Sequence, residues 1–164
     1  MLTAMIRHLG AKGYGIIFTG FAKTGFVSHK GRVALMIRIL ISDDSPGVRE
    51  VLRTYFEKFP EKFQVVGEAA NGEEALRLAK ELKPDVILLD IRMPILDGIA
   101  ATRELALSDQ SHLVITYTGF PLPQLESIAK KAGAVAHLSK PFDLADLKQL
   151  ILKVVAQRRL EVPS

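Results

Sequence analysis

The chain has 164 residues, of which 48% are hydrophobic and 24% charged, and it contains no cysteine. This length suits one domain with a proper core. The composition excludes disorder of the bulk, a disulfide framework and thiolate chemistry. No apolar run reaches the length of a membrane span, so we expect a cytoplasmic protein. The net charge of +4 arises at the N-terminus: residues 1–35 carry five basic side chains and no acid, which leaves −1 for residues 36–164. Composition therefore gives no support for nucleic-acid binding by the main domain.

The first 35 residues contain six of the twelve glycines and show no convincing helical or alternating period. A basic, glycine-dotted arm of this kind is compatible with a nucleic-acid or membrane-surface tail. We favour a disordered leader or a mis-assigned start, because such composition buries little and Met36 stands directly before the first clear strand. The chain then divides into a leader (1–35), a domain (36–158) and a tail (159–164).

From Met36 onward, short apolar runs alternate with segments of helical spacing. They predict five strands, each followed by a helix. Five such units with short connections require a parallel sheet with right-handed crossovers and helices on both faces. A doubly wound α/β sheet fits this number of units, whereas a barrel needs more. The expected strands lie near 37–41, 63–67, 86–90, 113–117 and 134–138, and the expected helices near 46–56, 72–82, 98–107, 122–132 and 144–155.

The third strand is four apolar residues followed by Asp90. Such a run is typical of a strand buried on both faces, and its carboxyl end opens on the edge where these sheets bind ligands. A carboxylate there is costly to bury unless it is ionised beside a cation or reaches solvent. The plainer alternative is an aspartate that caps the following loop. The residues after the other strands decide between the two.

Polar side chains follow three of the other strands: Asp43 and Asp44 the first, Thr118 the fourth and Lys140 the fifth. In a parallel sheet these positions meet at one edge. Gathered carboxylates raise one another's pKa unless a cation lies among them, and oxygen ligands without His or Cys favour Mg²⁺. With an ammonium and a hydroxyl added, the site suits an incoming phosphoryl group, with Asp90 as the nucleophile.

Four motifs together resemble the receiver domain of two-component response regulators, of the stand-alone chemotaxis type, over residues 36–158. The resemblance implies a flavodoxin-like sheet of strand order 2-1-3-4-5 and transfer of a phosphoryl group to Asp90 from a sensor histidine kinase. The motifs are Asp43-Asp44, Asp90-x-x-Met93-Pro94-x-x-Asp97-Gly98, Thr118-Gly119 and Lys140-Pro141-Phe142.

The same resemblance implies the roles of individual side chains. Asp44 and Asp90 would bind Mg²⁺ directly and Asp43 largely through water, and the backbone carbonyl of Arg92 would be a third protein ligand. Thr118 and Lys140 would contact the phosphoryl oxygens. The Lys140–Pro141 peptide bond would be cis, which proline makes accessible.

Three further positions are assigned from their place in the motifs. In the family an aromatic side chain three residues before the lysine moves together with the threonine as a switch, and here that position is His137. The alternative for His137 is a strand histidine half exposed at the sheet edge. We expect Arg92 and Gly119 to tune rates, Arg92 by overhanging the phosphoryl group and Gly119 by leaving the pocket mouth open. His112 is expected at the surface.

Three classes of function remain. The first is a signalling switch with no enzyme activity beyond self-phosphorylation and autodephosphorylation. The second is a Mg²⁺-dependent aspartyl-phosphate phosphatase, which usually carries a second aspartate where Arg92 stands. The third is a pseudo-receiver or flavin-binding module, against which the complete acidic set argues. For the switch we expect a histidine kinase or phosphotransfer protein as donor. The output would be a protein target or a second copy, bound through the face built by the last two helices and the fifth strand, with no nucleic acid or membrane involved.

Overall fold

A computed structural model describes residues 3–8, 14–19, 24–27, 33–108, 112–120 and 122–161, with side chains from residue 36 onward. Its main feature is a five-stranded sheet in the order β6-β5-β7-β8-β9, whose neighbouring strands are all parallel. In chain order this is 2-1-3-4-5, which confirms the flavodoxin-like, doubly wound sheet. The strands are β5 (Ile37–Ser42), β6 (Phe63–Ala69), β7 (Val86–Asp90), β8 (Leu113–Thr118) and β9 (Ala136–Ser139).

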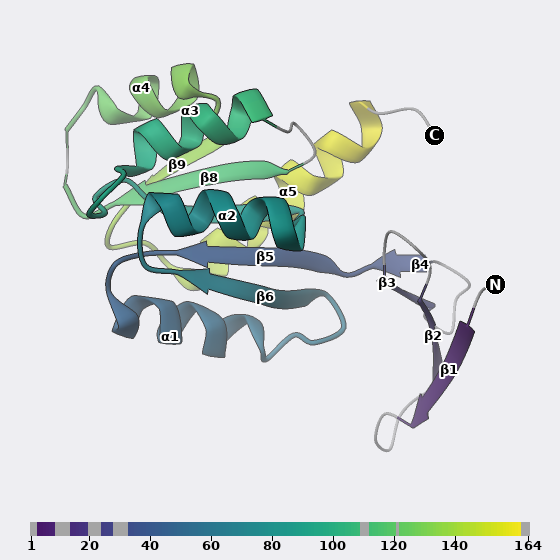
Figure 1. The fold of residues 1–164 in the computed structure, drawn as a ribbon. Helices are drawn as coiled ribbons and strands as arrows, with labels where there is room; N and C mark the ends of the chain where they lie inside the picture. The colour runs from purple at the N-terminus through teal and green to yellow at the C-terminus, as the bar shows by residue number, and fades with distance from the viewer. Residues whose placement is uncertain are drawn as a thin grey trace.

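Five helices cover the two faces of this sheet (Figure 1). One hydrophobic cluster joins the sheet to α1 and α5, and a second joins its other face to α2 and α3. The central strand β7 is buried along its whole length because both clusters use its side chains. The helices are α1 (Pro46–Phe56), α2 (Gly72–Leu82), α3 (Gly98–Ser108), α4 (Leu125–Ala132) and α5 (Leu144–Glu161).

Helices α1 and α2 each begin at a side-chain cap. The Ser45 hydroxyl accepts a hydrogen bond from the Val48 backbone N–H at 3.4 Å, and the Asn71 side chain accepts one from Glu74 N–H at 2.9 Å. Such caps satisfy backbone donors that the first helical turn leaves unpaired. The first of them starts α1 only a few residues after the end of β5, so the loop that carries the acidic motif is short.

Two helix boundaries differ from those expected. The helix expected from residue 122 begins at Leu125, because Leu122 precedes Pro123 and a residue in that position is disfavoured in a helix. The last helix runs to Glu161, beyond residue 158, where we expected the domain to end. The remainder of the expected tail, residues 162–164, lies outside the described residues.

Residues 1–35 contain four short strands that the sequence did not predict. They pair antiparallel in the order β1-β2-β3-β4. Strand pairing uses backbone groups, so it does not require the alternating side-chain pattern that we looked for. These strands lie in the segment that we expected to be a disordered leader or a mis-assigned start, and that expectation stays a prediction. Residues 1–2, 9–13, 20–23 and 28–32 lie outside the described residues. The strands are β1 (Thr3–His8), β2 (Tyr14–Thr19), β3 (Thr24–Val27) and β4 (Val33–Leu35).

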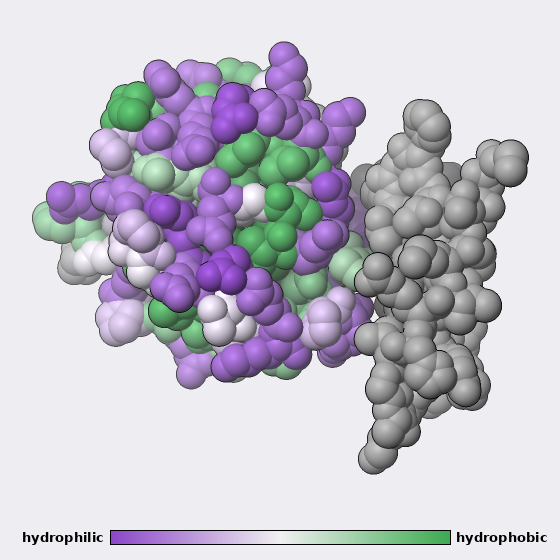
Figure 2. All heavy atoms as spheres, turned by 60° about the horizontal axis from the view of Figure 1, so that its bottom comes forward, coloured by the Kyte–Doolittle hydropathy of each residue, from purple (hydrophilic) through white to green (hydrophobic). Residues whose placement is uncertain are grey.

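The surface seen from the side of α1 is mostly hydrophilic, with a hydrophobic patch near its middle and smaller hydrophobic groups elsewhere (Figure 2). Over the described residues as a whole, the most exposed large hydrophobic side chains are Leu160, Leu107 and Ile95. None of the helices that the structure describes is both long and apolar enough to cross a membrane.

Candidate functional site

Three carboxylates meet at the carboxyl edge of the sheet. Asp43 and Asp44 follow β5, Asp90 ends β7, and one oxygen of each lies within 4.8 Å of the others. The strands are adjacent and Ser42 pairs with Leu89, so the residues that follow these two positions lie level with one another. Asp43 is 1% exposed and Asp90 5%, whereas Asp44 is exposed. The structure thus brings together the three acids that the strand ends predicted.

Lys140 reaches the acids from the loop after β9. Its Nζ lies 2.9 Å from Oδ2 of Asp43 and 3.7 Å from Oδ1 of Asp90. The backbone of Lys140 is held in place because its N–H donates to the Thr118 carbonyl at 2.7 Å. The Lys140–Pro141 peptide bond is cis. The ammonium partly neutralises the two buried carboxylates. Burying them in the ionised form without a cation would cost much free energy.

Asp90 remains costly to ionise despite that ammonium. Burial raises its pKa to about 6; Lys140 acts in the opposite direction, and the charges of Asp43 and Asp44 raise the pKa further. Oδ1 of Asp90 is buried without a hydrogen bond, a situation that native structures seldom leave unexplained. The three carboxylates are hard oxygen ligands, and one of their buried oxygens has no hydrogen bond. This combination fits a divalent cation such as Mg²⁺.

Thr118 and Gly119 form the end of β8 beside the acids. The Thr118 side chain is 1% exposed, and its hydroxyl accepts a hydrogen bond from the Phe120 backbone N–H at 3.2 Å. This bond uses the oxygen, so the hydroxyl hydrogen can donate to a ligand. Among the described residues, a Cβ at Gly119 would meet nothing nearer than the Lys140 side chain at 3.9 Å. The role of Gly119 in tuning rates stays a prediction.

Arg92 lies over an aromatic ring next to the site. Its Cζ is 5.1 Å from the ring centroid of Phe120, which fits a cation–π contact. The contact joins the loop after β7 to the loop after β8. Both loops leave strands that carry site residues, and the role of Arg92 in tuning rates stays a prediction.

His137 lies on β9 and contacts a neighbouring strand instead of the acids. Its Nδ1 is 3.0 Å from Oγ1 of Thr116, its register partner on β8. Burial lowers its pKa; Glu126 has the opposite effect, and Lys130 lowers the pKa further. The ring is therefore mostly neutral at neutral pH and is linked to the strand that ends in Thr118.

One residue of the site was missed by the sequence analysis, which read Tyr117 as part of an apolar strand. The Tyr117 side chain is fully buried, its hydroxyl donates to the Ser42 carbonyl at 3.3 Å, and Lys140 Nζ lies 4.7 Å from its ring centroid. Burial raises the pKa of Tyr117 well above its usual value, and the nearby Asp43 carboxylate adds to the effect. A tyrosine among aliphatic residues directly before Thr118 was the available signal, since a buried tyrosine needs a polar partner.

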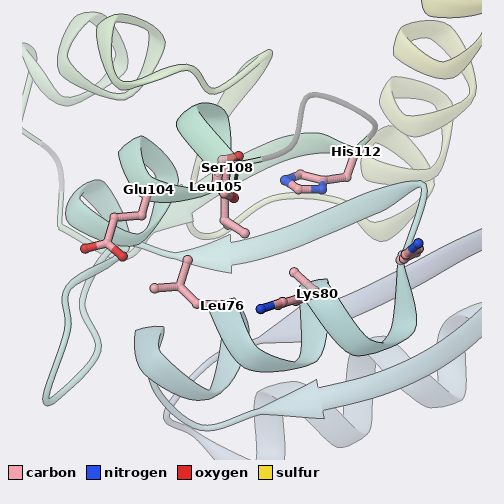
Figure 3. A pocket seen from close by; sticks show the side chains of 8 residues that line it. Leu76, Lys80, Glu104, Leu105, Ser108 and His112 are labelled. Atoms are coloured by element: carbon pink, nitrogen blue, oxygen red, sulfur yellow. Dashed lines mark hydrogen bonds between the residues drawn. The ribbon is translucent and has the colours of Figure 1, made fainter.

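His112 is buried, not at the surface as expected. It is 8% exposed and lines a cavity of about 500 Å³ between α2 and α3, where Lys80, Leu76 and Leu105 also lie (Figure 3). His112 stands directly before β8, and side chains of both helices line the same cavity, which the sequence alone did not reveal. The cavity contains none of the acidic-site residues.

Comparison with known proteins agrees with this geometry. The family model of the response regulator receiver domain matches residues 39–152. The chain belongs to that family. The receiver is 38% identical over 122 residues to the transcriptional regulatory protein PdtaR of Mycobacterium tuberculosis, covering 74% of this chain but only 58% of that protein. It is 37% identical over 118 residues to the chemotaxis protein CheY of Halobacterium salinarum, covering 72% and 96%.

A solved structure supports the same assignment. The receiver resembles the CheX-CheY-BeF3-Mg²⁺ complex from Borrelia burgdorferi with a TM-score of 0.68 and 31% identity, covering 76% of this chain and 91% of that one. The resemblance drawn from four sequence motifs is thus confirmed at the level of the family. Membership supports a phosphoacceptor role in two-component signalling.

Proposed function

We propose that this receiver is a phosphoacceptor switch in which Asp90 takes a phosphoryl group from the phosphohistidine of a sensor kinase or phosphotransfer protein. The observation that supports this most directly is the meeting of Asp43, Asp44 and Asp90 with Lys140 at one sheet edge. A structural ion pair needs one acid and one base, whereas this site has an excess of acid in a buried place. Such an excess is typical of functional sites.

Mg²⁺ is the proposed cofactor, and the fit rests on the donor set described above. Asp43, Asp44, Asp90 and the backbone carbonyl of Arg92 would hold the ion. When bound, it neutralises charge on the acids and on the transferring phosphoryl oxygens. The similar Borrelia complex is one of a CheY with Mg²⁺ and BeF3, which supports the same cofactor here.

The chemistry asked of the chain is positioning and charge neutralisation. An ionised oxygen of Asp90 attacks phosphorus while the phosphorus–nitrogen bond breaks, and the electron pair leaves with the imidazole. The product is an acyl phosphate on Asp90. Lys140 is already 3.7 Å from the attacking carboxylate, so a small shift away from Asp43 brings the ammonium to a phosphoryl oxygen. The Thr118 hydroxyl donates to another.

The conformational change on phosphorylation would be transmitted through β8 and β9. When Thr118 moves toward the phosphoryl group, β8 also carries Thr116, whose hydroxyl is bonded to His137. His137 interacts electrostatically with Glu126 and Lys130 of α4. We therefore propose that the α4–β9–α5 face changes on phosphorylation and binds a downstream protein or a second copy of the chain, without direct contact with nucleic acid or membrane.

The donor protein would approach from the side of α1. A groove of about 470 Å³ runs from Lys140 to the start of α1 and is lined by apolar side chains that include Val48 and Val51, the latter 55% exposed. Because Lys140 belongs both to the groove and to the acidic site, a protein bound there holds its phosphohistidine close to Asp90. From the proposed phosphohistidine donor we also propose that the receiver is cytoplasmic.

We propose no enzyme activity beyond self-phosphorylation and autodephosphorylation. The alternative of a Mg²⁺-dependent aspartyl-phosphate phosphatase lacks support at Arg92, which stands where such enzymes usually have a second aspartate. Arg92 contacts Phe120 and cannot act as a general acid, because a guanidinium does not release its proton in proteins.

The test is incubation of the full chain with Mg²⁺ and acetyl phosphate, followed by intact mass measurement. We expect a gain of one phosphoryl group, lost in Asp90→Asn and on chelation of Mg²⁺. Asp97→Asn is the matched control, since Asp97 lies in the same loop but accepts hydrogen bonds from the first turn of α3. Absence of any gain would favour a pseudo-receiver, and rapid turnover of foreign phosphate esters would favour the phosphatase.

A further inference from the structure

Tyr117 touches three of the parts that build the acidic site. Its hydroxyl donates to the carbonyl of Ser42, the residue before Asp43. Its ring faces Lys140 Nζ at 4.7 Å and packs edge-on against Phe142 at 5.6 Å, in the loop that follows Lys140. The side chain therefore links the end of β5 to the loop after β9, across the sheet.

Lys140 needs such a support because its own side chain is flexible. The ammonium sits on a four-carbon stem that is 27% exposed, and a free lysine side chain loses considerable entropy when held in one place. Its two carboxylate contacts differ in length, 2.9 Å to Asp43 and 3.7 Å to Asp90, so these contacts alone favour the acid that is not the nucleophile. The ring of Tyr117 attracts the ammonium without favouring either carboxylate, because the attraction to a ring face is broad.

We propose that Tyr117 is a positioning residue for phosphorylation of Asp90: its ring holds the Lys140 ammonium between Asp43 and Asp90, and its bond to Ser42 fixes the ring. This inference rests on the proposed function. The ring offers a cation-binding surface along the path that Lys140 must take from Asp43 toward the phosphoryl group. The hydroxyl is secondary, since its bond to the Ser42 carbonyl orients the ring and its other interaction is with Asp43, not with Lys140.

The first experiment reads the geometry in the unphosphorylated full chain and needs no variant. Protons beside the face of an aromatic ring resonate at higher field, so the ε-methylene protons of Lys140 are expected upfield of those of the other lysines in proton NMR with labelled lysine. The shift should persist in Tyr117→Phe and vanish in Tyr117→Leu. Lys140 protons at the ordinary lysine position in the unsubstituted chain would overturn the proposal.

The second experiment measures the rate constant of phosphorylation at saturating acetyl phosphate and Mg²⁺, together with the concentration of acetyl phosphate that gives half of that rate. Tyr117→Leu should lower the rate constant by about five- to twentyfold with little change in the half-saturating concentration, which corresponds to the usual strength of a cation–π contact. Tyr117→Phe keeps the ring and should stay within about threefold of the unsubstituted chain.

The matched control is Phe56→Leu, which also removes a fully buried ring from the cluster between the sheet and α1, and whose ring contacts are with Tyr55 and Phe63. Its rate constant should stay near that of the unsubstituted chain. Equal rates in Tyr117→Leu and Tyr117→Phe, or equal loss in Phe56→Leu, would overturn the proposal. An unsubstituted chain that takes up no phosphoryl group would instead overturn the proposed function, so the two failures are distinguishable.

Discussion

Asp90 is a buried acid of the site and also the proposed nucleophile. It is 5% exposed, and burial raises its pKa from the ordinary value of 3.8 to about 6. The folded chain therefore holds this carboxylate in a form that costs free energy at neutral pH. A cation or a phosphoryl group bound at Asp90 would remove that free-energy cost. The folded chain is therefore less stable without its ligand than with it.

The first prediction follows from that pKa. A folded-state pKa raised from 3.8 to about 6 makes the ionised carboxylate destabilising by about 3 kcal/mol. Below pH 4 the carboxyl group is protonated in the folded and the unfolded chain, so this cost is absent. The folded chain loses stability as the pH rises through 6, where its own carboxyl group ionises. Asp90→Asn should thus be more stable than the unsubstituted chain at pH 7 by about 1–3 kcal/mol, and by much less at pH 4. Urea unfolding with a metal chelator at both pH values measures this, and a difference independent of pH would contradict it.

The second prediction concerns Arg92. Its contact with Phe120 at 5.1 Å spans the loops beside Asp90, so Arg92→Asn should open the site to water and shorten the lifetime of the phosphorylated form severalfold. Phe120→Leu, which removes the ring that holds the guanidinium, should act in the same direction. The double variant should then lose little more than either single one, because both remove the same contact. Loss of phosphoryl group is followed by intact mass, and an unchanged lifetime in Arg92→Asn rejects the role.

At the scale of elements, the start of α3 is packed directly against the end of β7. A Cβ at Gly98 would lie 2.2 Å from the Asp90 carbonyl oxygen and 2.7 Å from Cα of Ile91. The Gly98 backbone N–H also donates to the Ile91 carbonyl at 2.9 Å. This helix therefore fixes the backbone of Asp90, the proposed phosphoacceptor, and glycine is needed because no side chain fits between the two elements.

The third prediction uses that close approach. Gly98→Ala should destabilise the fold by about 1–3 kcal/mol and slow phosphorylation, because the backbone of Asp90 must shift to make room. Gly119→Ala is the control: it adds the same methyl group where the nearest atom is 3.9 Å away, so stability should change little. Chemical denaturation of both variants is the measurement. Equal stabilities would show that the end of β7 moves freely.

The sequence predicted the position of those site residues that lie at strand ends. Asp43, Asp90, Thr118 and Lys140 could be placed together because parallel strands bring their carboxyl ends to one edge, whatever the details of packing. The contacts made by Tyr117 could not be predicted in the same way. The Tyr117 hydroxyl on β8 reaches Ser42 on β5 with β7 between them, and the apolar period does not show which side chains meet across the sheet.

The same limit explains two other differences. The bond between Thr116 and His137 exists because β8 and β9 pair in one particular register, whereas the order of residues shows only how far His137 stands from Lys140 along the chain. His112 was expected at the surface because the sequence offered no partner for it, yet it is buried and lines the cavity between α2 and α3. Burial of a residue next to a strand depends on the neighbouring layer, which is distant in sequence.

At the scale of the whole molecule, the described hydrophobic clusters draw their side chains from residue 37 onward. The fourth prediction is that a chain beginning at Met36 keeps its free energy of unfolding within about 0.5 kcal/mol and its phosphorylation rate within about twofold, the usual range for changes away from a core. A chain beginning after Ile41, which lacks most of β5, is the control and should not fold. Loss of stability in the first truncated chain would show that residues 1–35 contribute to the fold.

The ion pair between Asp43 and Lys140 joins residues 97 positions apart. No short stretch of chain can form it alone, since β5, β7, β8 and β9 must all have docked before the two side chains meet. Contacts of such long range form late, after loops of high entropic cost have closed. A newly made or partly unfolded copy therefore lacks this pairing, which exists only in molecules whose four strands β5, β7, β8 and β9 have assembled.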